Sequence, residues 1–261
     1  MVLSTASMAN GVDHKVYQRI ASLDLCMDWL LAYYADPSSV LALSPLHQRY
    51  PLPINAVKWP VHDGSLEQLI SLDPDLVIVG EFNALMLRSQ LQRLGVNIEV
   101  LALPRSLNEV EHYLLRFTEL LGISIAPANA QISNLQGEGL NQKTVNDPTP
   151  RLLLLGANAV GTGKDTFEDQ LITQSGWQNY LTTSGYITLD LEQLASDPPD
   201  AILWAASDSV ALAHQFTQHP VLTKQLPEHV WLTTDYWRWQ CPGPWTYELI
   251  DQLSVLREAF D

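Results

Sequence analysis

The sequence predicts an α/β protein with two similarly built lobes, each formed around a mainly parallel sheet. Short apolar runs alternate with amphipathic segments along the chain, which is typical of βαβ series. The stretch LEQLISLDPD at Leu66–Asp75 returns 125 positions later as LEQLASDPPD at Leu191–Asp200, with seven of ten residues identical. The first apolar strands of the two halves begin at Arg19 and Arg151, a similar offset of 132 residues. A repeated order and spacing indicates two related units.

In the first half, apolar runs predict strands at Arg19–Asp24, Val40–Pro45, Leu76–Gly80 and Asn97–Pro104. Helical spacing between them predicts helices at Cys26–Ala35, Leu66–Leu72, Ala84–Leu94 and Ser106–Gly122. Ser65 is a suitable N-cap for the second of these helices, and Pro74 ends it because proline disfavours a helical residue before it. Ser106 and Glu109 have the spacing of a capping box. The segment Leu46–Gly64 is rich in proline and aromatic residues and predicts an irregular loop.

The polar stretch 126–147 predicts a connecting helix, although Gly137 and Gly139 weaken it by about 1 kcal/mol each. After the break at NDPTP the alternation restarts. It predicts a strand at Arg151–Ala157, a loop and helix at Gly161–Gly176, the second copy of the repeated corner, a strand at His229–Thr234 and a closing helix at Trp245–Phe260. We therefore expect an N-terminal lobe at 16–125 and a C-terminal lobe at 148–261, with residues 1–15 outside the fold.

The composition indicates a globular protein and excludes two classes of partner. Of the 261 residues, 46% are apolar and 16% charged, so the chain can build real cores. The net charge of −15 makes nucleic acid an unsuitable partner, because phosphate binding needs a basic surface. No run of about 18 apolar residues is present, so no helix is expected to span a membrane.

The N-terminal segment and the two cysteines each leave alternatives open. Ser7 and Ala9 are spaced as at a signal-peptidase site, but no apolar run precedes them. Residues 1–15 are therefore either an unstructured leader or the end of a secretory signal, and a cytosolic relative that is never exported remains an alternative. Cys26 and Cys241 belong to no CxxC motif and are either two buried free thiols or one long-range disulfide.

No enzymatic motif emerges from the chain. The stretch Gly156–Phe167, GANAVGTGKDTF, suggests a phosphate-binding loop, but Lys164 is followed by Asp165 where that motif needs serine or threonine. The serines have no GxSxG setting. Histidines do not pair at metal-ligand spacing, so binding of a bare metal ion is not expected.

Several stretches together resemble the substrate-binding proteins of ABC importers for metal chelates. They are RIASLDLCMDWLLAYYADPSSVLALSP, the two copies of the repeated corner and CPGPWTYELIDQL. The resemblance covers Arg19–Phe260 and implies a class III periplasmic binding protein fold, with two Rossmann-like lobes joined by a backbone helix. It implies a periplasmic monomer without a cofactor of its own. Such a protein captures a ferric siderophore, cobalamin or haem in the cleft and delivers it to a permease dimer.

An enzyme with two Rossmann-like lobes, which binds a nucleotide or cofactor in the cleft, is the alternative. It would need a glycine-rich fingerprint or a set of cysteine ligands. The chain has neither, so we expect a binding protein rather than an enzyme.

Ligands of open parallel sheets bind beyond the carboxyl ends of the strands, so we expect the binding residues just after strands. Flat aromatic rings offer broad contact to a macrocycle, and guanidinium groups suit anionic ligands. The candidates are Tyr50, Trp59, His62 and Arg105 in the first lobe and Thr162, Lys164, Tyr186, Trp237, Arg238 and Trp239 in the second. Three of these candidates also have a purely structural alternative. Trp59 could belong to a core, His62 could make only a structural hydrogen bond, and Arg105 could be a solvated residue at the start of a helix.

Glu67 and Glu192 occupy matching places in the repeated corner. The resemblance implies that one carboxylate on each lobe docks on permease arginines, which makes these two glutamates candidates. The alternative is that each is an exposed glutamate favoured by a helix dipole.

Overall fold

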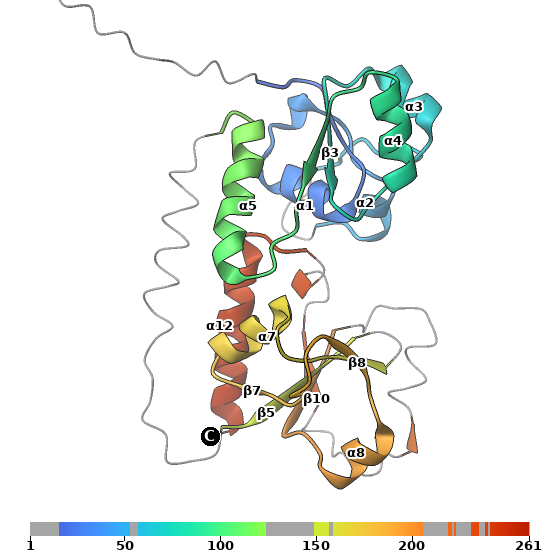
Figure 1. Cartoon of the computed structure of the whole chain (residues 1–261). Helices are drawn as coiled ribbons and strands as arrows, with labels where there is room; N and C mark the ends of the chain where they lie inside the picture. Colours follow the sequence, from blue (N-terminus) through green and yellow to red (C-terminus); the bar gives the residue numbers. More distant parts are fainter. Residues whose placement is uncertain are drawn as a thin grey trace, which may run out of the picture.

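The computed structural model describes residues 16–52, 57–123, 149–156, 159–205, 219–220, 222, 231–234, 238–239 and 241–260. Figure 1 shows two α/β lobes, one above the other, each with its own sheet. The predicted fold class is thereby confirmed. The predicted leader at 1–15 and the predicted connecting helix at 126–147 lie outside the described residues. Among the residues described, no helix combines the length and apolar character that a membrane span requires.

The first lobe contains a four-stranded, fully parallel sheet in the order β2-β1-β3-β4. Its strands are β1 (Ile20–Ser22), β2 (Val40–Ala42), β3 (Leu76–Gly80) and β4 (Ile98–Leu101). Its helices are α1 (Leu25–Tyr34), η1 (Pro37–Ser39), α2 (Leu46–Arg49), α3 (Leu66–Leu72), α4 (Leu85–Arg93) and α5 (Leu107–Leu120). Ile78 packs into the core with α1 and α5, whereas its neighbour Val77 packs with α3 and α4. This alternation explains why β3 is apolar throughout.

The second lobe contains the sheet β10-β9-β5-β6-β8, with β7 beside β5. Its elements are β5 (Arg151–Leu155), β6 (Val160–Thr162), α7 (Phe167–Gln174), β7 (Gln178–Asn179), β8 (Tyr186–Thr188), α8 (Leu191–Ser196), β9 (Ala201–Trp204), β10 (Trp231–Thr233), α12 (Trp245–Arg257) and η4 (Glu258–Phe260). The strands β5, β9 and β10 are parallel, while β6 and β8 extend the sheet in antiparallel fashion. Leu154 and Leu155 again pack into cores on opposite faces.

One hydrophobic core reaches from the first lobe into the second. It includes Trp29 of α1, Phe117 of α5, Leu154 of β5 and Trp245 of α12. The rings of Trp29 and Trp245 meet edge to face, with centroids 6.0 Å apart. In Figure 1, α5 and α12 follow one another along the same side of the molecule. The two lobes therefore share apolar packing on that side.

The repeated corner makes equivalent hydrogen bonds to the first strand in both lobes. Asp75 accepts the backbone N–H of Arg19 at 3.0 Å, and Asp200 accepts that of Arg151 at 2.7 Å. Each arginine returns a hydrogen bond to the corner: Arg19 Nε donates to the Asp73 carbonyl at 2.8 Å. The guanidinium of Arg151 donates to the Pro198 carbonyl at 2.7 Å. The corner thus fixes the first strand of each lobe beside its neighbour.

Three details differ from the expectations. The predicted loop at Leu46–Gly64 contains the short helix α2. The predicted loop that begins at Gly161 contains the end of strand β6, where a Cβ on Gly161 would lie 2.5 Å from the Leu181 side chain. Ser106 makes no side-chain cap, and Glu109 accepts the backbone N–H of Arg105 at 2.9 Å, one residue before the N-cap, so the predicted capping box does not form.

Candidate ligand-binding site

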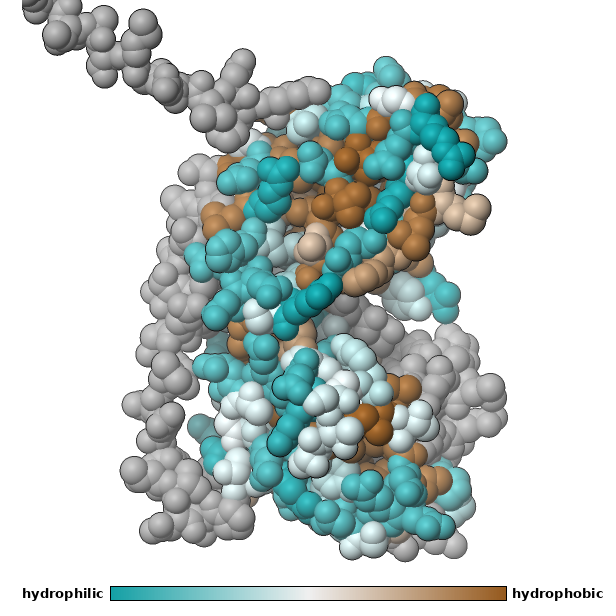
Figure 2. All heavy atoms as spheres, viewed as in Figure 1, coloured by the Kyte–Doolittle hydropathy of each residue, from teal (hydrophilic) through white to brown (hydrophobic). Residues whose placement is uncertain are grey.

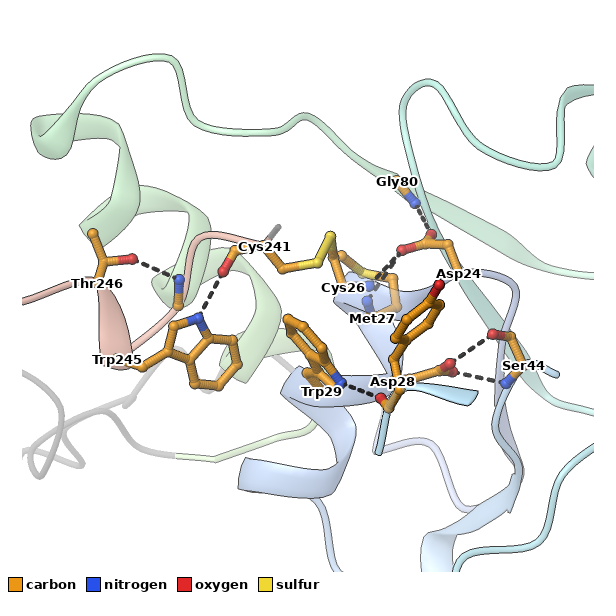
Figure 3. The surroundings of a disulfide bond; sticks show 12 residues. Asp24, Cys26, Met27, Asp28, Trp29, Ser44, Gly80, Cys241, Trp245 and Thr246 are labelled. Atoms are coloured by element: carbon orange, nitrogen blue, oxygen red, sulfur yellow. Dashed lines mark hydrogen bonds between the residues drawn. A yellow bond between two sulfur atoms is a disulfide. The ribbon is translucent and has the colours of Figure 1, made fainter. Parts of the chain in front are cut away.

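The carboxyl ends of the strands of the first lobe face the second lobe. Helix α1, which begins three residues after β1 ends, is bonded through Cys26 to Cys241, in the segment between β10 and α12. This disulfide settles the alternative that the sequence left open, and it brings the two Cα atoms to 5.0 Å (Figure 3). The backbone N–H of Leu107, which follows β4, donates to Gln170 of α7 at 3.0 Å. The region beside these contacts is where ligands of parallel sheets bind.

Three of the predicted residues in the second lobe lie on or just beyond β6 and β8. Thr162 and Tyr186 are direct partners across the two strands, and the N–H of Lys164 donates to the Thr183 carbonyl at 2.9 Å. Thr162 is buried, whereas Lys164 and the ring of Tyr186 are exposed. A Cβ at Gly163 would lie 2.0 Å from the Thr183 oxygen, so this glycine serves strand packing.

The hydroxyl of Tyr186 donates to the carboxylate of Glu168 at 3.1 Å. Partial burial of the hydroxyl and the charge of Glu168 raise the pKa of Tyr186 to about 12, so the phenol stays protonated at neutral pH. Burial also raises the pKa of Glu168 above its ordinary value. The pair therefore offers a ligand a fixed aromatic ring beside a hydrogen-bonded carboxylate.

The four predicted residues of the first lobe occupy different environments. Trp59 is buried in the main core. His62 is also buried, and its Nε2 donates to the Ser22 carbonyl at 2.8 Å while Nδ1 accepts the N–H of Gly64 at 3.0 Å. Burial lowers the pKa of His62, so the ring is neutral. Any ligand contact by His62 would have to replace one of these hydrogen bonds.

Tyr50 and Arg105 are more accessible. Tyr50 is half-buried beside α1, and its carbonyl accepts the indole N–H of Trp29 at 2.9 Å. The guanidinium of Arg49 lies over the Tyr50 ring, 5.2 Å from the centroid. Arg105 is exposed at the start of α5. In the chain, Tyr50 follows β2 and α2, and Arg105 follows β4.

In the segment after β10, Trp237 lies outside the described residues. The neighbouring Trp239 is half-buried, and its indole N–H donates to Thr234 at 2.6 Å, directly after β10. Arg238 is largely buried and forms an ion pair with Glu248 at 3.7 Å. This loop is thus fastened both to the end of β10 and to the start of α12.

The most exposed apolar side chains near a strand end were not among the predicted residues. Phe82, Leu85 and Met86 follow β3, and they are 65%, 55% and 80% exposed. Ala84 between them has a left-handed φ of 48°, which is unusual for a residue other than glycine. Large apolar residues directly after a buried strand were the signal in the sequence that points to this surface. Figure 2 shows hydrophobic residues gathered on the upper lobe.

Glu67 and Glu192 are exposed in the first turns of α3 and α8. Both helices begin at a side-chain cap, although the bonded N–H differs: Ser65 accepts the N–H of Gln68 at 3.2 Å, and Asp190 accepts that of Glu192 at 2.8 Å. The two glutamates therefore share their exposure and their place in the first turn. Within the described parts of the chain, no three His, Cys, Asp or Glu side chains gather as a metal site would require.

Comparison with known proteins gives one family and several similar structures. A family model described as periplasmic binding protein matches residues 57–226. No curated protein matches the chain. A periplasmic haem-binding protein from Pseudomonas aeruginosa has 22% identity and a TM-score of 0.66, with 93% of this chain and 92% of that chain covered.

Two further solved structures have the same fold. A periplasmic vitamin B12-binding protein of Vibrio cholerae has 15% identity and a TM-score of 0.67, with 93% and 97% covered. A possible iron-binding, periplasmic solute-binding protein from Staphylococcus epidermidis has 17% identity and a TM-score of 0.68, with 93% and 99% covered.

Proposed function

Because the chain belongs to the periplasmic binding protein family, we propose that it is the substrate-binding component of an ABC importer. It captures a metal chelate, which is a ferric siderophore, cobalamin or haem, between its two lobes. It then delivers the chelate to the permease. The ligands named for three structures of the same fold, haem, vitamin B12 and iron, support this class.

The observation that carries the proposal is the apolar surface after β3, at an end of the sheet that faces the second lobe. Phe82, Leu85 and Met86 are exposed there. An apolar surface opposite a few polar side chains suits a ligand with a large apolar body and a few polar groups. Lys164 and Tyr186 of the second lobe supply polar groups on the other side.

The proposed binding surface combines these residues with the candidates from the sequence. We propose ligand contacts for Tyr50, Trp59, His62, Arg105, Thr162, Lys164, Tyr186, Trp237, Arg238 and Trp239. The exposed Tyr186 is the strongest of them, because its ring is accessible and its hydroxyl is held by Glu168. Trp59 and His62 are buried in the described conformation, so a ligand contact from either would require its side chain to become accessible on binding.

We further propose that the protein works as a monomer in the periplasm, without a cofactor of its own. Glu67 and Glu192 would dock on the permease dimer, one from each lobe. Their exposure and equivalent positions support this assignment. The enzyme alternative has no specific observation in its favour.

Titration with haemin, cyanocobalamin and a panel of ferric siderophores tests the proposed function. The eight tryptophans provide the signal, because a bound chromophore quenches their fluorescence. One chelate is expected to bind with submicromolar affinity, and its metal-free form serves as the control. Failure of every chelate to quench or to raise the melting temperature would refute the proposal.

A further inference from the structure

Asp24 joins two elements of the first lobe that are far apart in sequence. It lies at the end of β1 and is 3% exposed. Its Oδ1 accepts the backbone N–H groups of Cys26 at 3.0 Å and Met27 at 3.2 Å, which caps α1. Its Oδ2 accepts the N–H of Gly80 at 2.6 Å, and Asn83 also hydrogen bonds to the carboxylate. Figure 3 shows this carboxylate between α1 and Gly80.

Residues 80–86, which we name the rim turn, carry the exposed apolar side chains. The turn is tightly held: the N–H of Asn83 donates to the Gly80 carbonyl at 3.1 Å, and Arg88 donates to the Glu81 carbonyl at 3.0 Å. A Cβ at Gly80 would lie 3.1 Å from the Asn83 side chain and 3.4 Å from Asp24 Oδ2. Contact between Asp24 and the rim turn therefore depends on a glycine at this position.

On its other side, Asp24 is connected to the second lobe. Cys26, which donates to Asp24, is the residue whose sulfur is bonded to Cys241. One carboxylate thus lies between the point where the lobes are covalently joined and the surface that carries Phe82 and Met86.

We propose that Asp24 is a positioning residue, which sets the rim turn relative to the disulfide-linked second lobe and thereby determines chelate affinity. The inference rests on the proposed function for its ligand. Asp24 itself is buried and does not touch the chelate. It acts through Gly80 and Asn83, whose positions fix the direction of the apolar side chains that follow.

Three variants separate this role from the capping of α1. In Asp24→Asn, the remaining oxygen can still cap α1, but the amide nitrogen faces the N–H donors of Gly80 and Asn83. Asp24→Ser keeps a capping hydroxyl that is too short to reach Gly80. Gly80→Ala crowds the same contact from the opposite side. Asp36→Asn is the matched control, because Asp36 also caps a helix, at 2.8 Å from the N–H of Ser38, before β2 begins.

Two measurements are made on each full-length variant. Hydrogen exchange of the ligand-free protein is expected to accelerate in residues 80–88 and to stay unchanged in β2 and in the second lobe. Affinity for the chelate that the wild-type protein binds, among haemin, cyanocobalamin and ferric siderophores, is expected to fall by roughly tenfold, the effect of one lost charged hydrogen bond. Asp36→Asn is expected to change neither.

The results distinguish three outcomes. Rim-turn exchange and affinity like those of Asp36→Asn would overturn the inference. Uniformly faster exchange throughout the first lobe would also overturn it, because Asp24 would then only stabilise the fold. If the wild-type protein binds none of the probes, the proposed function fails and the affinity claim with it, whereas localised exchange would still support the positioning of the turn.

Discussion

At the residue scale, Asp28 is the least usual group in the first lobe. It has no exposed surface and accepts hydrogen bonds from the N–H and hydroxyl of Ser44, at 2.7 and 2.6 Å, and from the hydroxyl of Ser22. Burial raises the pKa of Asp28 to about 7 in spite of these bonds. The carboxyl group is therefore partly protonated at neutral pH, and the stability of the protein depends on its titration.

Asp28→Asn is expected to change the pH dependence of unfolding. Because the folded pKa of Asp28 lies above the unfolded value, the native state binds more protons between about pH 4 and 7, and Asp28 costs stability as pH rises through that window. In the wild-type protein this titration lowers the free energy of unfolding by an amount on the order of a few kcal/mol between pH 4 and 8. The variant should lack that decrease. Urea unfolding at several pH values measures it.

Asp24 and His62 also titrate near Asp28. Burial raises the pKa of Asp24, which acts in the same direction, and burial lowers the pKa of His62, whose contribution is lost as pH falls. Asp24 and His62 are present in both the variant and the wild-type protein, so their contributions to the pH dependence cancel to first order when the two are compared. Parallel stability curves for the two proteins would contradict the assignment to Asp28.

Phe82→Ala is expected to weaken chelate binding without loss of stability. The ring is 65% exposed in the free protein, so it contributes little to the core and has apolar surface left to bury against a ligand. Burial of that surface is worth about 1–2 kcal/mol, or roughly tenfold in affinity. Val255→Ala is the matched control, because Val255 is 66% exposed on α12. Equal affinities of the two variants would count against the apolar surface after β3.

At the scale of elements, the repeated corner is a clamp between a strand and the turn before its neighbour. The carboxylates of the aspartates at its end accept backbone N–H groups at the start of the first strand, so they hold that strand's main chain through side-chain hydrogen bonds. Glu67 and Glu192 do not contribute to this clamp. The similarity between the two copies thus has a structural cause in Asp75 and Asp200, while the glutamates at its start remain available for another role.

Asp75→Asn and Asp200→Asn are each expected to lower the free energy of unfolding by about 1–2 kcal/mol, because a charged acceptor is replaced by an amide. Asp73→Asn is the matched control, since Asp73 has a left-handed φ of 50° that asparagine also tolerates. Chemical denaturation measures all three variants. A control as destabilised as Asp75→Asn would show that charge at the corner, rather than the clamp, is responsible.

Local patterns predicted most elements, because each is defined by residues close in sequence. The run at Leu76–Gly80 was a strand by composition, and the proline at position 74 marked its start. The antiparallel pair of β6 and β8 was missed because it joins Thr162 to Tyr186 across a segment that contains α7 and β7. Phe82 was missed for a different reason: its place after a buried strand is visible in the sequence, but its exposure is a property of the folded chain.

At the scale of the whole molecule, the two lobes are joined by covalent and apolar contacts. The disulfide spans 215 positions, and the core shared by α1, α5 and α12 lies beside it. A joint of this kind resists wide opening of the lobes, so chelate binding is expected to involve only small closure.

Cys26→Ser combined with Cys241→Ser is expected to destabilise the protein. A crosslink that closes a loop of this length restricts the unfolded chain and thereby stabilises the folded protein by about 5 kcal/mol, although relaxation of the unfolded chain reduces this value. The urea midpoint should fall in the double variant and, to the same value, in the wild-type protein after reduction. Mass spectrometry verifies the reduction, and an unchanged midpoint would show that apolar packing alone joins the lobes.

Glu67→Ala combined with Glu192→Ala is expected to abolish transport in cells that depend on the importer while leaving chelate affinity unchanged. Both carboxylates are exposed, and they lie on helices that precede β3 and β9 rather than on the segments that follow these strands. Glu258→Ala, another exposed glutamate, is the control. Normal transport by the double variant would move permease docking to other residues.

The disulfide also sets the order in which the protein can mature. Cys26 leaves the ribosome early, but its partner follows 215 residues later. The crosslink therefore forms only after the first lobe has been synthesised and has had time to fold. With only two cysteines in the sequence, no wrong intramolecular pair exists, so oxidation completes the protein without an isomerase.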